Sequence, residues 1–415
     1  MTATNTRPPQ ERATGEQVAD GFDGPDDPAL QELFEQVAEG AEQRERDDRN
    51  PFEAVDLVRT AGLGAFRLPA DRGGSGGSLR DLFGVLCRLA ESDPQVAHIL
   101  RSHFLFVEEQ LRDADTGSRD RWLEQVRQGA VFGNATAELS GNDAGSLRWE
   151  TQLTPDGRGF RLNGAKFFTT GTLFADFVYV VAGTANGAVA RVVVPIERPG
   201  VRVRDDWDGF GQRLTGSGST TFEDVSVDPE EVFPFVSAPD DGRLWYSSFQ
   251  QLYLQAVIVG VLRGVVRDAV ALVHGRNRTY SHAAGATPPE DPQLQQVIGT
   301  LASNAYAAEA AVLAAADAQD RAVASVRGGV IDPELDHHAA LEASKAKVVV
   351  DDLGQRSATQ LFEVGGASAT RRSTNLDRHW RNIRTLSSHN PTLYKARAIG
   401  EYHVNGTPLP RNGYF

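Results

Sequence analysis

The sequence contains a single cysteine, Cys87, among 415 residues, so an internal disulfide framework is excluded. One thiol is typical of a protein from a reducing compartment. The chain also lacks an excess of positive charge, because 42 Lys and Arg stand against 56 Asp and Glu, for a formal net charge of −14. Binding to nucleic acid or to an anionic membrane needs a basic face, so neither partner is expected.

No long apolar run is free of charged residues. The most apolar stretch, 252–273, contains Arg263, Arg267 and Asp268, which a membrane-spanning segment would not place there. We therefore predict a buried core helix and no membrane. The first fifteen residues lack the apolar core of a secretory signal, so we expect no export and a cytoplasmic location.

Motifs for nicotinamide, nucleotide and metal binding are missing as well. Neither a GxGxxG nor a GxxxxGK[ST] motif follows a predicted strand, so a Rossmann site and a P-loop are not supported. The pair His337–His338 lacks the i, i+4 spacing of a helical zinc site, and we predict no metal. If electrons enter from NADH, another protein has to accept them first.

The apolar pattern predicts an α+β protein of several domains, as expected for a chain of this length. Residues 1–27 are polar and rich in Pro, Gly and Asp, which predicts a disordered tail. Helical spacing predicts an N-terminal helical domain over 28–130. Short Val-, Phe- and Thr-rich runs between turn residues predict a central β-barrel or β-sandwich over 131–238. Ala-rich helical spacing then predicts a C-terminal four-helix bundle over 239–415.

Four motifs occur in register with this order of domains. They resemble the P-x-x-x-G-G connection, the N-G-x-K-x-W-I-T strand beside the flavin, the G-x-R-x-S segment and the late glycine pair of acyl-CoA dehydrogenases. Their positions are 69–74, 162–171, 211–227 and 362–366. The resemblance extends from about residue 30 to the C-terminus and implies the acyl-CoA dehydrogenase fold.

A narrower resemblance is carried by segments 132–138, 205–207, 377–385 and 388–395. They are similar to the flavin-dependent monooxygenase branch that includes dibenzothiophene monooxygenase. Members of this branch take reduced flavin from a separate reductase and form a flavin C4a-hydroperoxide with O2. The resemblance implies a two-component monooxygenase that oxygenates S, N or aromatic C in a small organic substrate. FMN is the expected cofactor, and FAD is the alternative.

The catalytic base of a dehydrogenase is absent from both places where the family carries it. Between residues 378 and 402 the single acid is Glu401, which lies past the matching place, and the earlier place holds Leu254 and Gln255. Loss of a general base removes catalysis worth about 10²–10⁴-fold, so thioester dehydrogenation is disfavoured. Two alternatives stay open: an acyl-CoA dehydrogenase with a displaced base, and a catalytically silent binding subunit with a flavin fold.

The resemblance implies three catalytic residues: His103, His389 and Thr170. An imidazole exchanges protons near neutral pH because its ordinary pKa is about 6.5. We expect His389 to bond the nascent hydroperoxide and His103 to polarise oxygen or orient substrate. Thr170 matches the hydroxyl residue that faces flavin N5. The alternative for either histidine is a buried structural residue.

The resemblance also implies the cofactor contacts. Asn134 and Thr136 match residues at the pyrimidine edge of the flavin, Thr170 faces its N5, and Trp207 would wall the site. Arg278 would reach the flavin phosphate, and it would do so from a neighbouring subunit. An arginine suits this contact because a guanidinium forms forked bonds to phosphate. Gly366 belongs to the late glycine pair near the cofactor.

One departure from the family pattern concerns the phosphate. Ser368 stands where the resembling enzyme has an arginine, so the set of phosphate contacts stays open. Tetramers are usual in the family, and the long Ala-rich helices predict a homotetramer. The expected partners are thus a small-molecule substrate, O2, a flavin reductase and three further copies of the chain.

Overall fold

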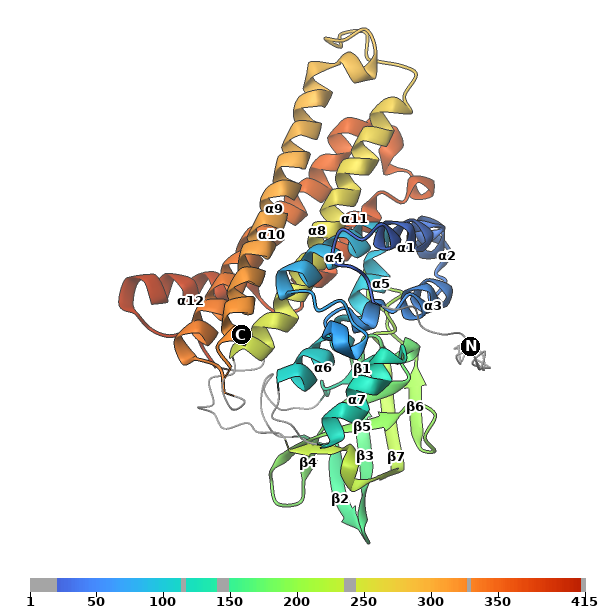
Figure 1. Ribbon diagram of the computed structural model, residues 1–415. Helices are drawn as coiled ribbons and strands as arrows, with labels where there is room; N and C mark the ends of the chain where they lie inside the picture. Colours follow the sequence, from blue (N-terminus) through green and yellow to red (C-terminus); the bar gives the residue numbers. More distant parts are fainter. Residues whose placement is uncertain (1–20, 113–116, 140–148, 235–243, 327–329, 412–415) are drawn as a thin grey trace.

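The computed structural model describes residues 21–112, 117–139, 149–234, 244–326 and 330–411 (Figure 1). Long helices form one end of the molecule and a β-sheet forms the other, with shorter helices between them (Figure 1). Most of the predicted tail 1–27, and the predicted boundary at 238/239, lie outside the described residues.

The N-terminal part is helical. Its elements are α1 (Pro28–Ala38), α2 (Ala41–Asp47), α3 (Phe52–Thr60), the 3-10 turns η1 (Leu63–Ala65) and η2 (Ala70–Arg72), α4 (Leu79–Ser92), α5 (Pro94–Ile99), α6 (Arg101–Arg112) and α7 (Gly117–Arg127). The short helix α5 begins sharply because Asp93 Oδ1 accepts the backbone N–H of Gln95 at 2.9 Å and proline occupies the first helical position.

The central part is a sheet. Its strands are β1 (Phe132–Ala135), β2 (Gln152–Asp156), β3 (Gly159–Lys166), β4 (Phe177–Thr184), β5 (Val189–Pro195), β6 (Val201–Arg204), β7 (Ser219–Val227) and β8 (Val232–Pro234), with η3 (Thr172–Phe174) and η4 (Pro229–Glu231) between them. The order is β6-β7-β3-β2-β4-β5-β8, and β1 pairs in parallel with β4. Because β2 pairs only with residues 183–184 of β4, β1 occupies the other half of that edge, at 177–180.

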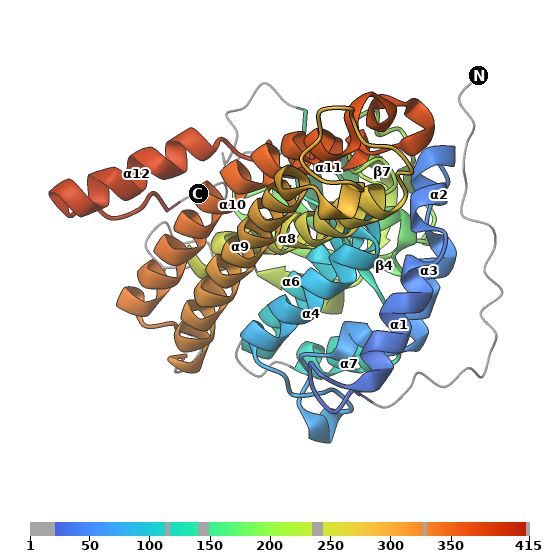
Figure 2. The same cartoon turned by 90° about the horizontal axis from the view of Figure 1, so that it is seen from above.

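The C-terminal part returns to helices: α8 (Leu244–His274), η5 (Pro288–Glu290), α9 (Pro292–Ala324), α10 (Pro333–Gly365), η6 (Gly366–Thr370), η7 (Arg372–Thr374), α11 (Asp377–Ser387) and α12 (Thr392–Asn405). The long helices α8, α9 and α10 lie side by side with the shorter α11, and α12 projects away from them (Figure 2). The predicted core helix 252–273 lies within α8, whose residues 252–262 are buried.

The predicted order of helices, strands and helices is confirmed. One apolar core joins α1, α3, α4 and α5 to the long helices, while the sheet has a second core of its own. Within the described residues, α9 has the length and apolar composition to cross a membrane, and 22% of its most apolar window is buried. Core and interface helices of proteins without membranes can have the same composition.

Candidate active site

Hydroxyl side chains bond in series between the turn that follows β3 and the segment that precedes β7. Thr170 Oγ1 lies 2.7 Å from Ser217 Oγ, which lies 2.7 Å from Thr215 Oγ1. Thr215 donates to the carbonyl oxygen of Gln212 at 2.9 Å. Each hydroxyl has one proton, so that last bond makes Ser217 donate to Thr215 and Thr170 donate to Ser217. In this hydroxyl series, Thr170 becomes a donor toward a ligand only when its bond to Ser217 breaks or reverses.

Two glycines bring this turn, β1 and α5 together. Gly171 has φ 82°, and a Cβ there would lie 2.4 Å from the carbonyl oxygen of Ile99 at the end of α5. A side chain is therefore excluded at that position on both backbone and steric grounds. A Cβ on Gly133 would lie 2.5 Å from Thr172, whose hydroxyl donates to the carbonyl of Asn134 at 2.9 Å.

Three predicted cofactor residues lie around the same turn. Thr136 Oγ1 donates to Asn134 Oδ1 at 2.7 Å just beyond β1. Trp207 Nε1 donates to the carbonyl of Gln212 at 3.1 Å, and its ring meets Phe168 edge to face with centroids 5.9 Å apart. Phe168 is 49% exposed, so these two rings form an apolar wall that solvent still reaches. The structure thus gathers Asn134, Thr136 and Trp207 beside the hydroxyl series.

His103 is placed differently from a histidine that meets oxygen or substrate. Its side chain is fully buried, and both ring nitrogens contact backbone: Nε2 lies 2.9 Å from the carbonyl of Gly64, and Nδ1 accepts the N–H of Phe132 at 3.4 Å. Burial lowers the pKa of His103 to about 4, so the ring is neutral at pH 7. These contacts are those of a structural histidine that holds β1 against η1.

His98, which sequence reasoning passed over, is the histidine directed toward the site. Its Nδ1 lies 2.9 Å from Gln212 Oε1, and its buried Nε2 has no partner among the described residues. Burial, followed by the charge of Arg101, lowers its pKa to about 3. His98 lies on α5 and His103 on the following helix, α6, and their rings contact different parts of the chain: Gln212 for His98, and Gly64 and Phe132 for His103. Nothing in the sequence indicates which one is directed toward the site.

His389 follows α11 and contacts Arg101. Arg101 Nη1 lies 3.2 Å from His389 Nε2, and a guanidinium can only donate, so the imidazole is neutral with its proton on Nδ1. His389 is exposed to solvent, and its ring lies against Arg101. Desolvation of the ring, followed by the charges of Arg101 and His98, lowers the pKa of His389 below its ordinary value. The structure therefore pairs His389 with Arg101.

Two polar side chains hold α11 in place. Asn382 Oδ1 accepts the backbone N–H of Gln212 at 2.7 Å, which ties α11 to the loop that precedes β7. Asp268 of α8 lies 2.7 Å from His379 Nε2 and also accepts from Arg378. These bonds explain why the segment 377–385 is rich in Arg, His and Asn, and they fix the position from which His389 extends.

Gln255 occupies the earlier of the two places where a dehydrogenase carries its base. Its side chain is 1% exposed on α8, and both amide atoms lack a hydrogen-bond partner within the described residues. One turn before it, Gln251 accepts from the side chain of Asn390 at 2.8 Å, and Asn390 follows His389 in the chain. The amide of Gln255 thus belongs to the helix face that meets the His389 segment.

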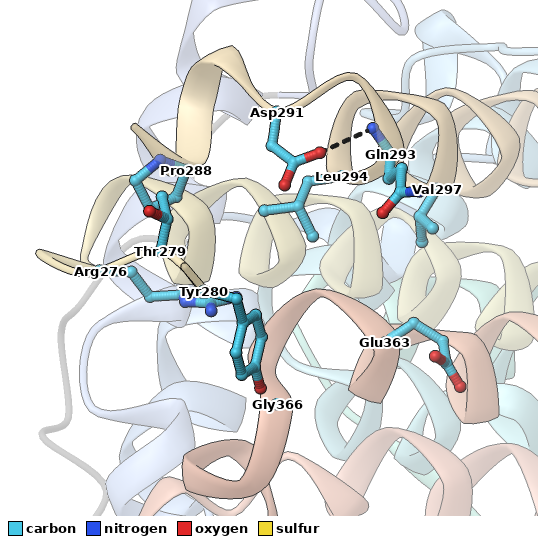
Figure 3. A pocket seen from close by; sticks show the side chains of 10 residues that line it. All are labelled: Arg276, Thr279, Tyr280, Pro288, Asp291, Gln293, Leu294, Val297, Glu363 and Gly366. Carbon is cyan, nitrogen blue, oxygen red and sulfur yellow. Dashed lines mark hydrogen bonds between the residues drawn. The ribbon is translucent and has the colours of Figure 1, made fainter. Parts of the chain in front are cut away.

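Arg278 and Gly366 lie far from these residues. A cavity of about 230 Å³ at the other end of the long helices is lined by Arg276, Tyr280 and Gly366 (Figure 3). Arg278 is exposed in the same loop and does not line this cavity. Tyr253 of α8 donates to Ala97 at 2.8 Å, and the helix continues for 21 residues to His274, which is about 30 Å further. One FMN does not span that distance within a single protomer.

Comparison with known proteins identifies the family. The acyl-CoA dehydrogenase middle-domain model matches residues 134–225, and the C-terminal-domain model matches residues 252–392. Together they cover more than half of the chain. The chain belongs to the acyl-CoA dehydrogenase family.

Its similar relatives place it in the flavin-dependent monooxygenase branch of that family, as predicted. Dibenzothiophene monooxygenase of Rhodococcus erythropolis is 28% identical over 394 residues, covering 91% of this chain and 93% of that protein. A probable FMNH2-dependent monooxygenase, SfnC, of Pseudomonas putida is 29% identical and covers 92% and 96%.

Solved structures agree with this placement. FMN-bound TdsC from Paenibacillus sp. A11-2 superposes with a TM-score of 0.85 at 28% identity, covering 93% of this chain and 98% of that chain. Methanesulfinate monooxygenase MsuC from Pseudomonas fluorescens superposes with a TM-score of 0.84 at 27% identity, with the same coverage.

Proposed function

We propose that this chain is the oxygenase of a two-component system that uses externally reduced FMN and O2 to oxygenate a small sulfur compound. One observation carries the proposal: the neutral imidazole of His98 contacts Gln212 at the end of the Thr170 hydroxyl series, a second neutral imidazole, His389, contacts Arg101, and an amide replaces the dehydrogenase base at Gln255. Proton transfer in such a site is handled by imidazole rather than by a carboxylate that attacks a thioester.

The residues present fit a reduced flavin. FMNH2 would supply two electrons, so that one atom of O2 enters the substrate and the other leaves as water. Thr170, Asn134, Thr136 and Trp207 would hold the ring, and the open lone pair on His98 Nε2 would accept a hydrogen bond from the oxygen side.

The phosphate end of FMN requires a second copy of the chain under this proposal. Arg276, Arg278 and Gly366 lie about 30 Å along α8 from His98, so a neighbouring protomer has to present them. The exposed Ala-rich face of α9 offers a surface for that assembly, which supports a homotetramer. Supply of FMNH2 by a separate reductase is supported by the missing nicotinamide motif and by the name of the SfnC relative.

A cytoplasmic location is proposed with the function. The single thiol, Cys87, is buried and free, as is typical of a protein from a reducing compartment. Detection of the chain in the soluble fraction of cells, with no processing of its N-terminus, would support this location, whereas export with cleavage would contradict it.

Two mixing experiments, the first without oxygen and the second with it, separate the proposed function from its rivals. The oxidised FMN protein is first mixed with acyl-CoA without oxygen, and no bleaching of the flavin is expected. The FMNH2 protein is then mixed with O2, with and without methanesulfinate or dibenzothiophene, while flavin absorbance and product are followed. We expect oxygenated product and a substrate-dependent change in the flavin transient.

Two other results would each identify one of the rival functions. Bleaching by acyl-CoA would identify a dehydrogenase with a displaced base. A flavin transient that no sulfur, nitrogen or aromatic compound alters, with no product formed, would identify a catalytically silent subunit.

A further inference from the structure

Gln212, in the loop between β6 and β7, is held in a strained backbone conformation. Its φ is 50°, in the left-handed region that residues other than glycine rarely adopt. Its backbone N–H donates to Asn382 Oδ1 at 2.7 Å, and its carbonyl oxygen accepts from Thr215 at 2.9 Å and from Trp207 at 3.1 Å. The residue is 1% exposed. Such strain persists only where the surroundings enforce it, and it is most frequent at functional sites.

Asn382 enforces this conformation because its own amide is fixed. Its Nδ2 donates to the carboxylate oxygens of Glu45 on α2, at 3.3 and 3.2 Å. Its Oδ1 is therefore left to accept the backbone N–H of Gln212, and it also accepts from the side chain of Gln95 on α5 at 3.4 Å. These bonds join α2, α5 and α11 to the loop, so the side chain of Gln212 starts from a fixed position beside α5.

The side chain of Gln212 decides which nitrogen of His98 carries the proton. Gln212 Oε1 lies 2.9 Å from His98 Nδ1. An amide oxygen can only accept, so Nδ1 carries the proton and Nε2 keeps a lone pair. A neutral imidazole in water carries its proton mainly on Nε2, and in a protein the bond made by one ring nitrogen sets the state of the other. The tautomer seen in His98 thus requires an acceptor at Nδ1.

From these contacts we infer that Gln212 is a positioning residue, which keeps His98 in the tautomer whose Nε2 lone pair is open to a ligand. This inference rests on the proposed function and adds the residue that prepares His98 for it. His98 Nε2 and Gln212 Nε2 are both buried and without partners among the described residues. Buried polar groups normally have partners. An acceptor on His98 and a donor on Gln212 complement a ligand oxygen that carries a proton.

The tautomer of His98 can be measured directly. The full chain, loaded with oxidised FMN, is prepared with ¹³C,¹⁵N-labelled histidine, and the imidazole signals are recorded by solid-state NMR. The signals of His98 are those that disappear in His98→Ala. We expect Nδ1 to be protonated and Nε2 to be bare. His103 is an internal reference with the opposite tautomer, because its Nε2 lies 2.9 Å from the carbonyl of Gly64 and its Nδ1 accepts from Phe132.

Variants at Gln212 test the cause. Gln212→Leu removes the acceptor, and Gln212→Asn suits the left-handed backbone but is one methylene too short to reach His98. Both should move the His98 proton to Nε2 and lower kcat by about tenfold or more at unaltered FMN affinity, while the His103 signals stay the same. Gln212→Glu keeps an acceptor in place and should keep Nδ1 protonated. Gln36→Leu, at an exposed position of α1, should change neither the tautomer nor kcat.

Tautomer and turnover together separate this inference from the proposed function. If the tautomer responds to Gln212 as expected but the unaltered protein forms no product with FMNH2 and O2, Gln212 sets the state of His98 and the monooxygenase proposal fails. The inference is overturned, with the monooxygenase proposal intact, by any of three results in a protein that forms product. These are a proton on His98 Nε2 in the unaltered protein, a proton that stays on Nδ1 in Gln212→Leu and Gln212→Asn, or an unchanged kcat in variants whose proton has moved.

Discussion

Replacement of His103 by alanine and replacement of His98 by alanine should have opposite effects on stability and activity. His103 is fully buried with two backbone contacts, so His103→Ala removes a packed ring and leaves the carbonyl of Gly64 and the N–H of Phe132 without partners. We expect a loss of about 3–5 kcal/mol in the free energy of unfolding, from the cavity and the unsatisfied groups together. Oxygenation per folded molecule should change little.

His98→Ala should do the reverse. The ring makes one bond, to Gln212, and its Nε2 is unpartnered, so the cost in stability should be about 2 kcal/mol smaller than for His103→Ala. Loss of a proton-transfer group should lower kcat by about 10²-fold or more.

The assay combines urea unfolding with product formation normalised to the folded fraction, and His338→Ala, at a side chain of α10 that is 45% exposed, serves as the control. The assignment of the two histidines is refuted if His103→Ala keeps full stability but loses activity while His98→Ala remains active.

Further variants test other contacts. Ser217→Ala removes the acceptor of Thr170, so Thr170 should donate to the flavin permanently, and the ratio of H2O2 to product should change at unaltered FMN affinity. If the ratio stays the same, the hydroxyl series has no role. Arg278→Gln should weaken FMN binding by about tenfold or more while far-UV circular dichroism stays constant; unchanged binding would remove it from the phosphate site. Stability should fall as pH decreases from about 6.5 to 4, because the unfolded chain takes up a proton that buried His103, with a pKa of about 4, does not. Chemical denaturation should show a smaller pH slope for His103→Ala, and an equal slope would contradict this.

Elements whose residues follow a simple period could be predicted from sequence. The strands β3, β4, β5 and β7 coincide with Val-, Phe- and Thr-rich runs, and α8 contains the apolar stretch interpreted as a core helix. These features depend on local spacing and on burial, which the pattern of apolar residues records directly.

The candidate site could be predicted only in part. Thr170, Asn134 and Trp207 belong to motifs with a fixed order, and the structure gathers them around one turn. The choice between His98 and His103 depends on how the two successive helices α5 and α6 are oriented, and the sequence does not contain those angles. The contact between Arg101 and His389 joins residues 288 positions apart, which no local pattern can indicate.

Oxygen-isotope labelling tests the central claim most directly. The FMNH2 protein is supplied with ¹⁸O2 and a sulfur substrate in ordinary water, and the product is analysed by mass spectrometry. A flavin-dependent monooxygenase predicts one ¹⁸O atom in each product molecule. A product that carries oxygen from water, or reduction of the flavin by acyl-CoA in the absence of oxygen, would contradict the account.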